Sequence, residues 1–298
     1  MDLQTSSRHL LVLGGRSVPR IVDSAGPNAS RRFVEFFTAT IRNKGTRSVY
    51  LHAVTEFFDW CDRHGVSLTA IEPIVVATYI ELLCETLSSP TVKLRLAAIR
   101  SMFDFLVTGH VIEFNPAASV KGPKHVVKKG KTPVLESTEA RHLLDSLDVT
   151  TVGGLRDRAL LGMMVYSFAR ISASLGMNEE DYVQRGRRMW FRLHEKGGKH
   201  HELPAHHNAE IYMDEYLDAA GIRARKTPIF RTLGRNGLLT QNRMHRTDAL
   251  RMIKRRAKAA GLPADLCCHT FRATGITAYL SNGGTLEKAH PGLSWIEV

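Results

Sequence analysis

The sequence predicts a mainly α-helical protein of two domains, with a small antiparallel sheet in the second. Apolar residues recur at helical spacing along most of the chain. Two short runs of strand character, 189–193 and 201–204, flank a Gly-rich turn. With 298 residues, 43% of them hydrophobic, the chain is too long for one typical small domain and can bury two cores.

The first domain is expected to be a helical bundle over residues 29–115, preceded by a loose or partly ordered arm over residues 1–28. The arm mixes Ser, Arg, Gly and Pro. Four apolar stripes of helical period follow, and Pro73 and the turn Ser88-Ser89-Pro90 mark the starts of the third and fourth. We expect helices near 33–41, 49–61, 74–87 and 92–106.

Residues 116–133 read as a linker, because Gly, Pro and Val are scattered among lysines after Asn115-Pro116. The second domain follows over residues 134–298. Ser137-Thr138-Glu139 gives the capping signal of its first helix. A hairpin is expected around Lys196-Gly197-Gly198-Lys199, and further helices near 158–168, 211–220, 251–260 and 271–280.

The charge balance favours a polyanionic partner. The formal net charge is +12 and the sequence pI is about 9.8, and nucleic acid is the usual partner of so basic a chain, although a merely basic soluble protein is the alternative. The linker holds the densest basic segment. A lysine run is often only a solvated loop, but between two domains we favour contact with a DNA backbone. The DNA-binding candidates are Lys121, Lys124, Lys128, Lys129 and Lys131.

Other classes of protein receive no support. The four cysteines form no CxxC pair, so neither a disulfide framework nor a zinc site is indicated. No apolar run approaches the length of a membrane span, and the N-terminus lacks the features of a signal peptide. We expect a cytoplasmic protein with reduced thiols, no membrane contact, no metal and no cofactor.

Four residues of the second domain could carry chemistry, and each also has an ordinary structural explanation. Arg170 follows an apolar helix, where arginine often caps carbonyl groups. Lys196 lies at the expected hairpin tip, a usual place for a solvated lysine. His269 and Arg272 are three residues apart and share a helix face, which suits phosphate binding but also fits a plain helix start.

The order of these residues behind a helical domain and a basic linker resembles the tyrosine recombinases of the phage integrase family. The resemblance runs from about Ser30 to Glu287. It implies a core-binding (SAM-like) first domain and a recombinase catalytic second domain, acting on double-stranded DNA in site-specific recombination or integration of a mobile element. It also implies assembly of several copies on DNA. The densest matches are Gly154–Leu161, Ser167–Ser172, Glu195–Lys199 and His269–Thr274.

The resemblance also implies a mechanism. In this family a tyrosine hydroxyl attacks a phosphodiester, and two arginines bind the phosphate oxygens, so that no metal is required. By this likeness Arg170 and Arg272 are the two arginines. His269 would hydrogen-bond the phosphate or assist proton transfer, and Lys196 would protonate the leaving 5′ oxygen. A phosphotyrosine intermediate conserves the bond energy for rejoining.

Two departures from the family stand out. After Asn282-Gly283-Gly284 the family continues with a helix and then the tyrosine, whereas here Pro291-Gly292 would break a helix and no tyrosine follows Tyr279. We therefore expect no nucleophile in this sequence, as after a truncation or frameshift, and regard Tyr279 as a core residue. Ala173 also stands where many relatives carry an acidic residue near the first arginine.

Three functions stay open at this point. The chain could be a recombinase by descent that binds DNA but cannot cleave it. It could be a working integrase whose tyrosine comes from residues missing here or from a partner protomer. It could also be a non-catalytic regulator that occupies recombination sites.

Overall fold

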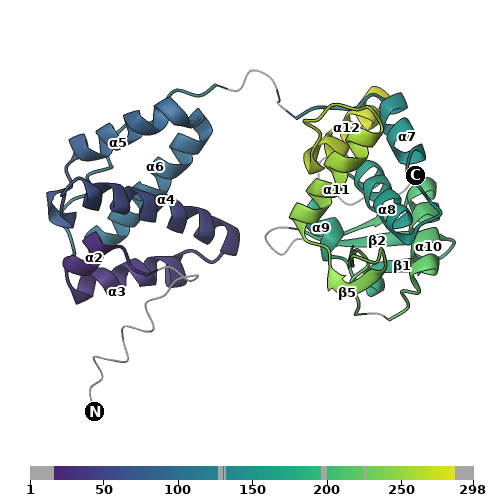
Figure 1. Cartoon of the computed structure of the whole chain (residues 1–298), viewed down its shortest axis with the longest axis horizontal. Coiled ribbons are helices and arrows are strands. Elements are labelled where there is room, and N and C mark those ends of the chain that lie inside the picture. Colours follow the sequence, from purple (N-terminus) through teal and green to yellow (C-terminus); the bar gives the residue numbers. More distant parts are fainter. Residues whose placement is uncertain (1–16, 127–129, 131, 196–199, 225, 286–298) are drawn as a thin grey trace, which may run out of the picture. The chain divides into compact units, whose positions relative to one another are not determined.

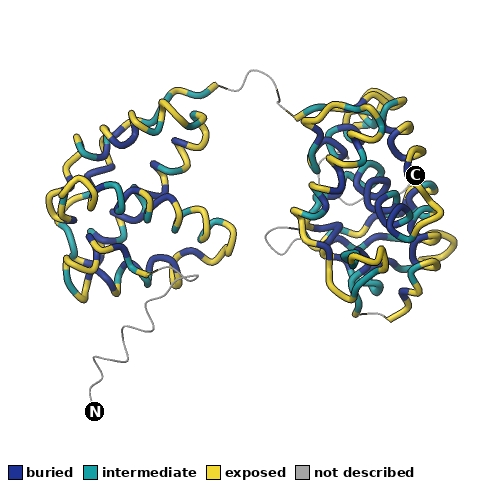
Figure 2. The backbone as a smooth tube through the Cα atoms, in the orientation of Figure 1, coloured by how far each residue is buried: buried dark blue, intermediate teal, exposed yellow. Residues whose placement is uncertain are grey.

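The computed structural model describes residues 17–126, 130, 132–195, 200–224 and 226–285, which form two compact units (Figure 1). The division falls between Lys128 and Lys129, inside the expected linker. Helices dominate both units and the strands are confined to the second, so the predicted fold class is confirmed. Buried residues occupy the inward faces of the helices in each unit (Figure 2).

The N-terminal unit is a bundle of helices around aromatic side chains. Asn43 begins the long helix α4 by accepting a hydrogen bond from the Thr46 amide at 3.0 Å. Pro73 and Pro90 occupy first-turn positions, where the missing N–H costs nothing. The elements are α2 (Arg20–Ser24), α3 (Pro27–Glu35), the π-helical turn η2 (Phe36–Thr40), α4 (Lys44–Arg63), the 3₁₀ turn η3 (Leu68–Ala70), α5 (Pro73–Thr86) and α6 (Ser89–Thr108).

The arm expected over residues 1–28 is ordered at its C-terminal end. Residues 20–24 form α2, which packs against α3 and α4. Ile21 and Val22 are buried in the core of the unit, with 4% and 0% exposure. Burial of these two side chains outweighs the Ser, Gly and Pro around them. Residues 1–16 lie outside the described part of the chain.

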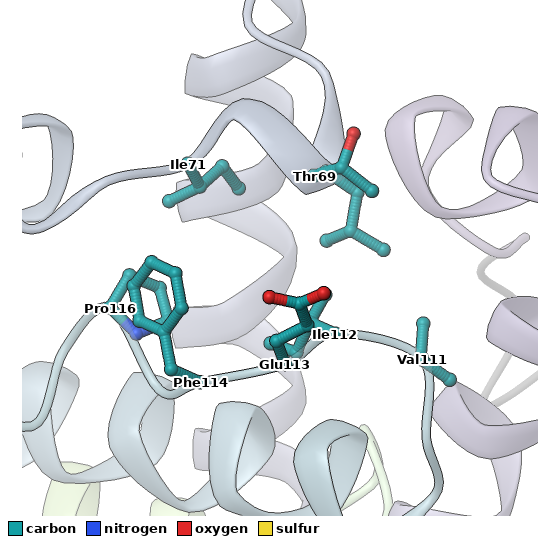
Figure 3. A pocket seen from close by; sticks show the side chains of 8 residues that line it. Thr69, Ile71, Val111, Ile112, Glu113, Phe114 and Pro116 are labelled. Atoms are coloured by element: carbon teal, nitrogen blue, oxygen red, sulfur yellow. The ribbon is translucent and has the colours of Figure 1, made fainter.

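A cavity of about 350 Å³ opens on the N-terminal unit between η3 and the segment that follows α6 (Figure 3). Its wall is mostly apolar, and Glu113 is its one charged lining residue. No cation lines it, so this cavity is not suited to a phosphate. It is lined by Leu68, Thr69, Ile71, Val111, Ile112, Glu113, Phe114 and Pro116.

The C-terminal unit surrounds α8, which packs against α7, α9, α10 and α12. Most residues of α8 are buried, which requires that other elements cover the helix on several sides. The helices are α7 (Ser137–Asp145), α8 (Val152–Ser167), α9 (Ile171–Gly176), the 3₁₀ turn η4 (Glu179–Asp181), α10 (His207–Ala220), α11 (Arg246–Ala259) and α12 (Cys268–Ser281).

Two antiparallel sheets complete this unit. The larger has strand order β1-β2-β3, from β1 (Tyr182–Arg185), β2 (Arg188–His194) and β3 (His200–Pro204). Its centre is Phe191, fully buried and paired with Tyr182 on one side and Leu203 on the other. The smaller sheet pairs β4 (Arg231–Leu233) with β5 (Leu239–Arg243).

The start of α7 differs from the sequence expectation. The N-cap is Glu136, one residue before Ser137, and it forms a capping box with Glu139. The preceding residue, Leu135, is buried, and its amide donates a hydrogen bond to Thr274 Oγ1 at 3.0 Å, which fixes its position. This contact joins the first residues of the unit to α12. No helix within the described ranges is long and apolar enough to cross a membrane.

Candidate active site

Arg170 lies at a sharp change of direction between α8 and α9. Phe168 ends α8 in the left-handed conformation, with φ 53° and ψ 24°, which is uncommon for a bulky residue. Arg170 then occupies the N-cap position of α9 and its carbonyl accepts hydrogen bonds from the Ala173 and Ser174 amides. Its side chain pairs with Glu195, where the sequence had also allowed a capping contact with the end of α8, and 42% of the side chain is exposed.

Arg272 reaches the same place from α12. Its Nη1 donates a hydrogen bond to the carbonyl oxygen of Phe168, two residues before Arg170. Burial, and then the positive charge of Arg170, lower the pKa of Arg272 from its ordinary value. The Phe168 carbonyl that Arg272 binds lies two residues before Arg170, which brings the two arginines to the same end of α8.

The close approach of α12 to α8 depends on Gly275. A Cβ atom at this position would lie 2.0 Å from the carbonyl oxygen of Val165 and 2.8 Å from the ring of Phe168. Only a residue without a side chain permits this contact. Gly275 lies one turn beyond Arg272 on α12 and so fixes the height of that arginine over the end of α8.

Of the remaining predicted site residues, the structure describes three. His269 lies at the exposed start of α12, one turn before Arg272. Lys121 and Lys124 are exposed in a segment without helix or strand. The other predicted lysines, Lys196, Lys128, Lys129 and Lys131, lie outside the described residues.

Glu195 is a member of this cluster that sequence reasoning missed. It follows β2 directly, and its carboxylate pairs with Nη1 of Arg170. Only 5% of its side chain is exposed. Ala173, at the position where relatives often carry an acid, is buried at 1% exposure and offers Arg170 no carboxylate. The sequence does show an acid directly before the expected hairpin lysine. Its pairing with Arg170 could not be predicted, because it depends on tertiary structure.

A buried ionic network, also missed, supports the opposite part of α8. Asp157 is fully buried and accepts hydrogen bonds from Arg156, at 2.6 and 3.1 Å, and from Nε of Arg256 on α11 at 2.9 Å. Arg156 also donates to the carbonyl of Arg231 on β4 at 2.8 Å. One carboxylate thus joins α8, α11 and the smaller sheet.

Tyr279 lies two turns beyond Arg272 on α12 and is half-buried rather than fully in the core. Its ring contacts Phe168 with 5.8 Å between centroids. Its edge also lies against Gly284, where an added Cβ would come within 2.2 Å of the Tyr279 ring. The ring is therefore held between the end of α8 and the turn after α12.

The arrangement can bind a tetrahedral anion. Among the described residues, Glu195 is the one carboxylate paired with either arginine, and the positive charge of Arg170 helps to lower the pKa of Arg272. A phosphate that accepts hydrogen bonds from both arginines would offset their positive charge, and arginine donates in a fork that suits phosphate oxygens. Within the described ranges, no three His, Cys, Asp or Glu side chains are grouped to hold a metal ion.

Comparison with known proteins gives related sequences along both units. Tyrosine recombinase XerD of Chlorobaculum tepidum is 27% identical over 264 residues, which cover 86% of this chain and 84% of the relative. Tyrosine recombinase XerC of Thermodesulfovibrio yellowstonii is 27% identical over 247 residues, covering 81% and 79%.

Solved structures share the fold. XerH site-specific recombinase bound to a palindromic difH substrate aligns with a TM-score of 0.69 at 16% identity, covering 90% of this chain and 77% of that one. A lambda integrase dimer bound to a COC′ core site aligns with a TM-score of 0.66 at 15% identity, covering 90% and 96%.

Two family patterns match consecutive parts of the sequence. The N-terminal SAM-like domain of phage integrases matches residues 32–110. The pattern of the phage integrase family itself matches residues 133–295, more than half of the 298 residues. The chain therefore belongs to the phage integrase family of tyrosine recombinases.

Proposed function

We propose that this protein binds double-stranded DNA in site-specific recombination, and that Arg170 and Arg272 hold the phosphate at which a strand is exchanged. The observation that carries the proposal is the meeting of these two arginines at the end of α8. The structures of relatives bound to recombination-site DNA support the partner, and their multimers on DNA support assembly of several copies.

The chemistry follows from what each side chain can do. The two guanidinium groups stabilise the negative charge that develops on the phosphate as a nucleophile attacks. His269, exposed one turn before Arg272, donates a hydrogen bond to the same phosphate or moves a proton. Lys196 protonates the departing 5′ oxygen. The likeness to the family supports these roles, and Lys196 directly follows Glu195, the partner of Arg170, in the sequence.

Selection of duplexes from a random-sequence library with the full chain, followed by measurement of Kd, tests the arginines. Arg170→Ala and Arg272→Ala should each weaken binding of the selected duplex roughly tenfold, because each removes a bidentate phosphate contact. Arg223→Ala is the matched control, since Arg223 pairs with exposed Asp218 after α10. Equal Kd values for all three variants would contradict the proposed site.

The linker lysines are proposed to follow the DNA backbone. Each lysine that neutralises one phosphate contributes about 0.9 to the slope of log K against log salt. Replacing Lys124, Lys128 and Lys129 together with Ala should flatten that slope and leave the sequence preference unchanged. An unchanged slope would show that these lysines do not contact DNA.

We further propose that none of the seven tyrosines in this sequence is the nucleophile. Tyr216 is fully buried, donates to the carbonyl of Ile229 at 2.8 Å, and burial raises its pKa to about 12. Burial also raises the pKa of Tyr182, whose hydroxyl donates to Asp214 at 2.9 Å. A hydroxyl engaged in this way is a poor nucleophile.

The other tyrosines are also engaged in packing. Tyr166 stacks on His206 with 4.3 Å between ring centroids, and Tyr212 lies under the guanidinium of Arg158 at 4.7 Å. Tyr50 and Tyr79 belong to the N-terminal unit. Tyr279 is the nearest along α12 to Arg272, but its ring is held against Phe168 and Gly284.

A suicide duplex that traps covalent protein–DNA adducts tests this proposal. The 298 residues alone should occupy their site and form no adduct. Adduct formation that Tyr279→Phe abolishes would show that Tyr279 is the nucleophile. Adduct formation that appears only when a relative's segment is fused after Gly284 would support the alternative of an integrase completed by residues outside this sequence or by a partner protomer.

The biological role that we propose is integration or excision of a mobile element. The likeness to lambda integrase supports this role. The relatives named XerD and XerC are also site-specific recombinases, but they are not named as integrases. Mapping the sites that the protein occupies in its own genome tests the role. Occupancy at the ends of an inserted element is expected, and occupancy confined to one site remote from any element would contradict it.

A further inference from the structure

Glu195 places a buried negative charge inside a site that otherwise collects positive charge. Its carboxylate is paired with Nη1 of Arg170, and its side chain is only 5% exposed, whereas 42% of the Arg170 side chain is exposed. Burial of a carboxylate is costly unless a partner compensates it. The fold therefore tolerates Glu195 here because Arg170 is its partner.

The two residues of this ion pair belong to different parts of the fold. Glu195 follows β2, and Arg170 begins α9, which packs directly against β2 (Figure 1). α9 itself, Ile171–Gly176, contains no acidic residue. Among the described residues, the acid that pairs with Arg170 thus comes from the sheet, at the point where the chain continues into Lys196.

Pairing with Glu195 leaves Arg170 able to bind a phosphate. A guanidinium has five N–H donors in a rigid fork, and the carboxylate engages it through Nη1. With five donors, the same guanidinium can also donate to a second acceptor such as a phosphate oxygen. An arginine anchored on one side also loses less side-chain freedom when it binds a ligand on the other.

We propose that Glu195 is a positioning residue, which orients the Arg170 guanidinium toward the phosphate. This inference rests on the proposed function, since it requires Arg170 to bind phosphate. Positioning and net charge predict opposite effects on DNA affinity, because a carboxylate near DNA should by itself repel the phosphates. Removal of Glu195 should therefore weaken binding, although bulk electrostatics alone would strengthen it.

The test measures the Kd of the full chain for its selected duplex at constant salt. Glu195→Ala should weaken binding roughly fivefold, an effect within the usual range for residues that act as a pair. Glu195→Gln should restore most of the affinity, because its amide oxygen still accepts a hydrogen bond from Arg170. Glu202→Ala is the matched control, since Glu202 on neighbouring β3 pairs with Arg185 and Arg192 outside the site.

A double-mutant cycle separates positioning from general loss of structure. In an Arg170→Ala background, Glu195→Ala should cause no further loss of affinity, whereas damage to the fold would add to the first loss. Tighter binding by Glu195→Ala and Glu195→Gln would show that the carboxylate blocks the site, and unchanged binding would show that it does neither. Either result overturns the inference while leaving the proposed function intact, which fails only if Arg170→Ala itself has no effect.

Discussion

The N-terminal unit buries an almost wholly apolar core, whereas the C-terminal unit buries charges as well. Among the described residues, Ser30 is the one buried polar side chain of the first unit. The second buries Arg156, Asp157 and Arg231, and adds the nearly enclosed Glu195. The first core is instead filled with aromatic rings that touch edge to face, among them Phe33, Phe36, Phe37, Phe57, Phe58 and Phe103.

This difference follows from what each unit must hold in place. Apolar packing is tolerant, because it rewards volume and not direction. Ionic hydrogen bonds are directional, and they are destabilising when one partner is missing. For the function proposed above, in which two arginines hold one phosphate, directional contacts are an advantage, since a fixed cation binds with less loss of freedom. The buried Arg156 and Asp157 lie on α8, and the carbonyl of Phe168 at the other end of this helix accepts a hydrogen bond from Arg272.

The largest effect is expected at Asp157. Asp157→Ala would leave the buried guanidinium of Arg156 and that of Arg256 without their shared carboxylate. Loss of one partner from a buried ion pair costs about 3–5 kcal/mol. Fluorine NMR of fluorotryptophan-labelled protein in urea can follow Trp60 in the first unit and Trp190 in the second separately. The Trp190 transition should shift to much lower urea, and the Trp60 transition should stay. Equal shifts would show that the units are not independent.

Gly275→Ala should have the next largest effect. The added methyl group would meet the backbone oxygen of Val165 at 2.0 Å, and backbone cannot move aside as a flexible side chain can. Overpacking of this kind costs about 1–3 kcal/mol. Because α12 must shift to relieve the clash, DNA affinity should fall together with the stability of the Trp190 transition. Gly176→Ala is the control, since a Cβ there meets nothing within 4 Å. Loss of stability without loss of affinity would show that α12 does not set the position of Arg272.

The two units also differ in how well the sequence predicts them. Helices α4, α5 and α6 follow apolar periodicity and their proline or Asn starts, so local signals suffice. The short elements α2 and α9 were missed, because five or six residues carry too little pattern and their burial depends on distant partners.

The candidate site shows the same limit. The likeness to the family selected Arg170 and Arg272, but their meeting depends on the Phe168 carbonyl, about a hundred residues from Arg272 in sequence. Strands β1, β4 and β5 were missed because pairing across turns defines them more than composition does. The pairing of Glu195 with Arg170 likewise exists only once β2 and α9 have packed.

A smaller effect is expected in the aromatic core. Phe103→Leu replaces a fully buried ring with a smaller apolar side chain among Phe57 and Phe58. Because neighbouring rings can repack, the cost should be only about 1 kcal/mol. The Trp60 transition should move slightly to lower urea, and DNA affinity should not change. A loss as large as that of Asp157→Ala would contradict the claim that the first core is the more tolerant one.

The smallest effect is expected for His206, through pH. Its Nδ1 accepts a hydrogen bond from the Asn208 amide at 3.2 Å as the N-cap of α10, and an accepting nitrogen cannot carry a proton. Burial against Tyr166, and then the charge of His207, lower the pKa of His206 from its ordinary value of 6.5. A histidine whose pKa is lower in the folded state stabilises the fold above the unfolded value and loses this contribution as the pH falls toward the folded value.

The Trp190 transition should therefore move to lower urea as the pH falls below about 6.5, and His206→Asn should reduce that movement. Asparagine is a favourable N-cap and does not titrate, so the variant keeps the acceptor for Asn208 while removing the proton uptake. His64→Asn, in the N-terminal unit, is the control and should leave the pH response of Trp190 unchanged. If His206→Asn leaves the response as steep as before, the acid sensitivity of the C-terminal unit belongs to other groups, and the directional contacts at the start of α10 contribute nothing to it.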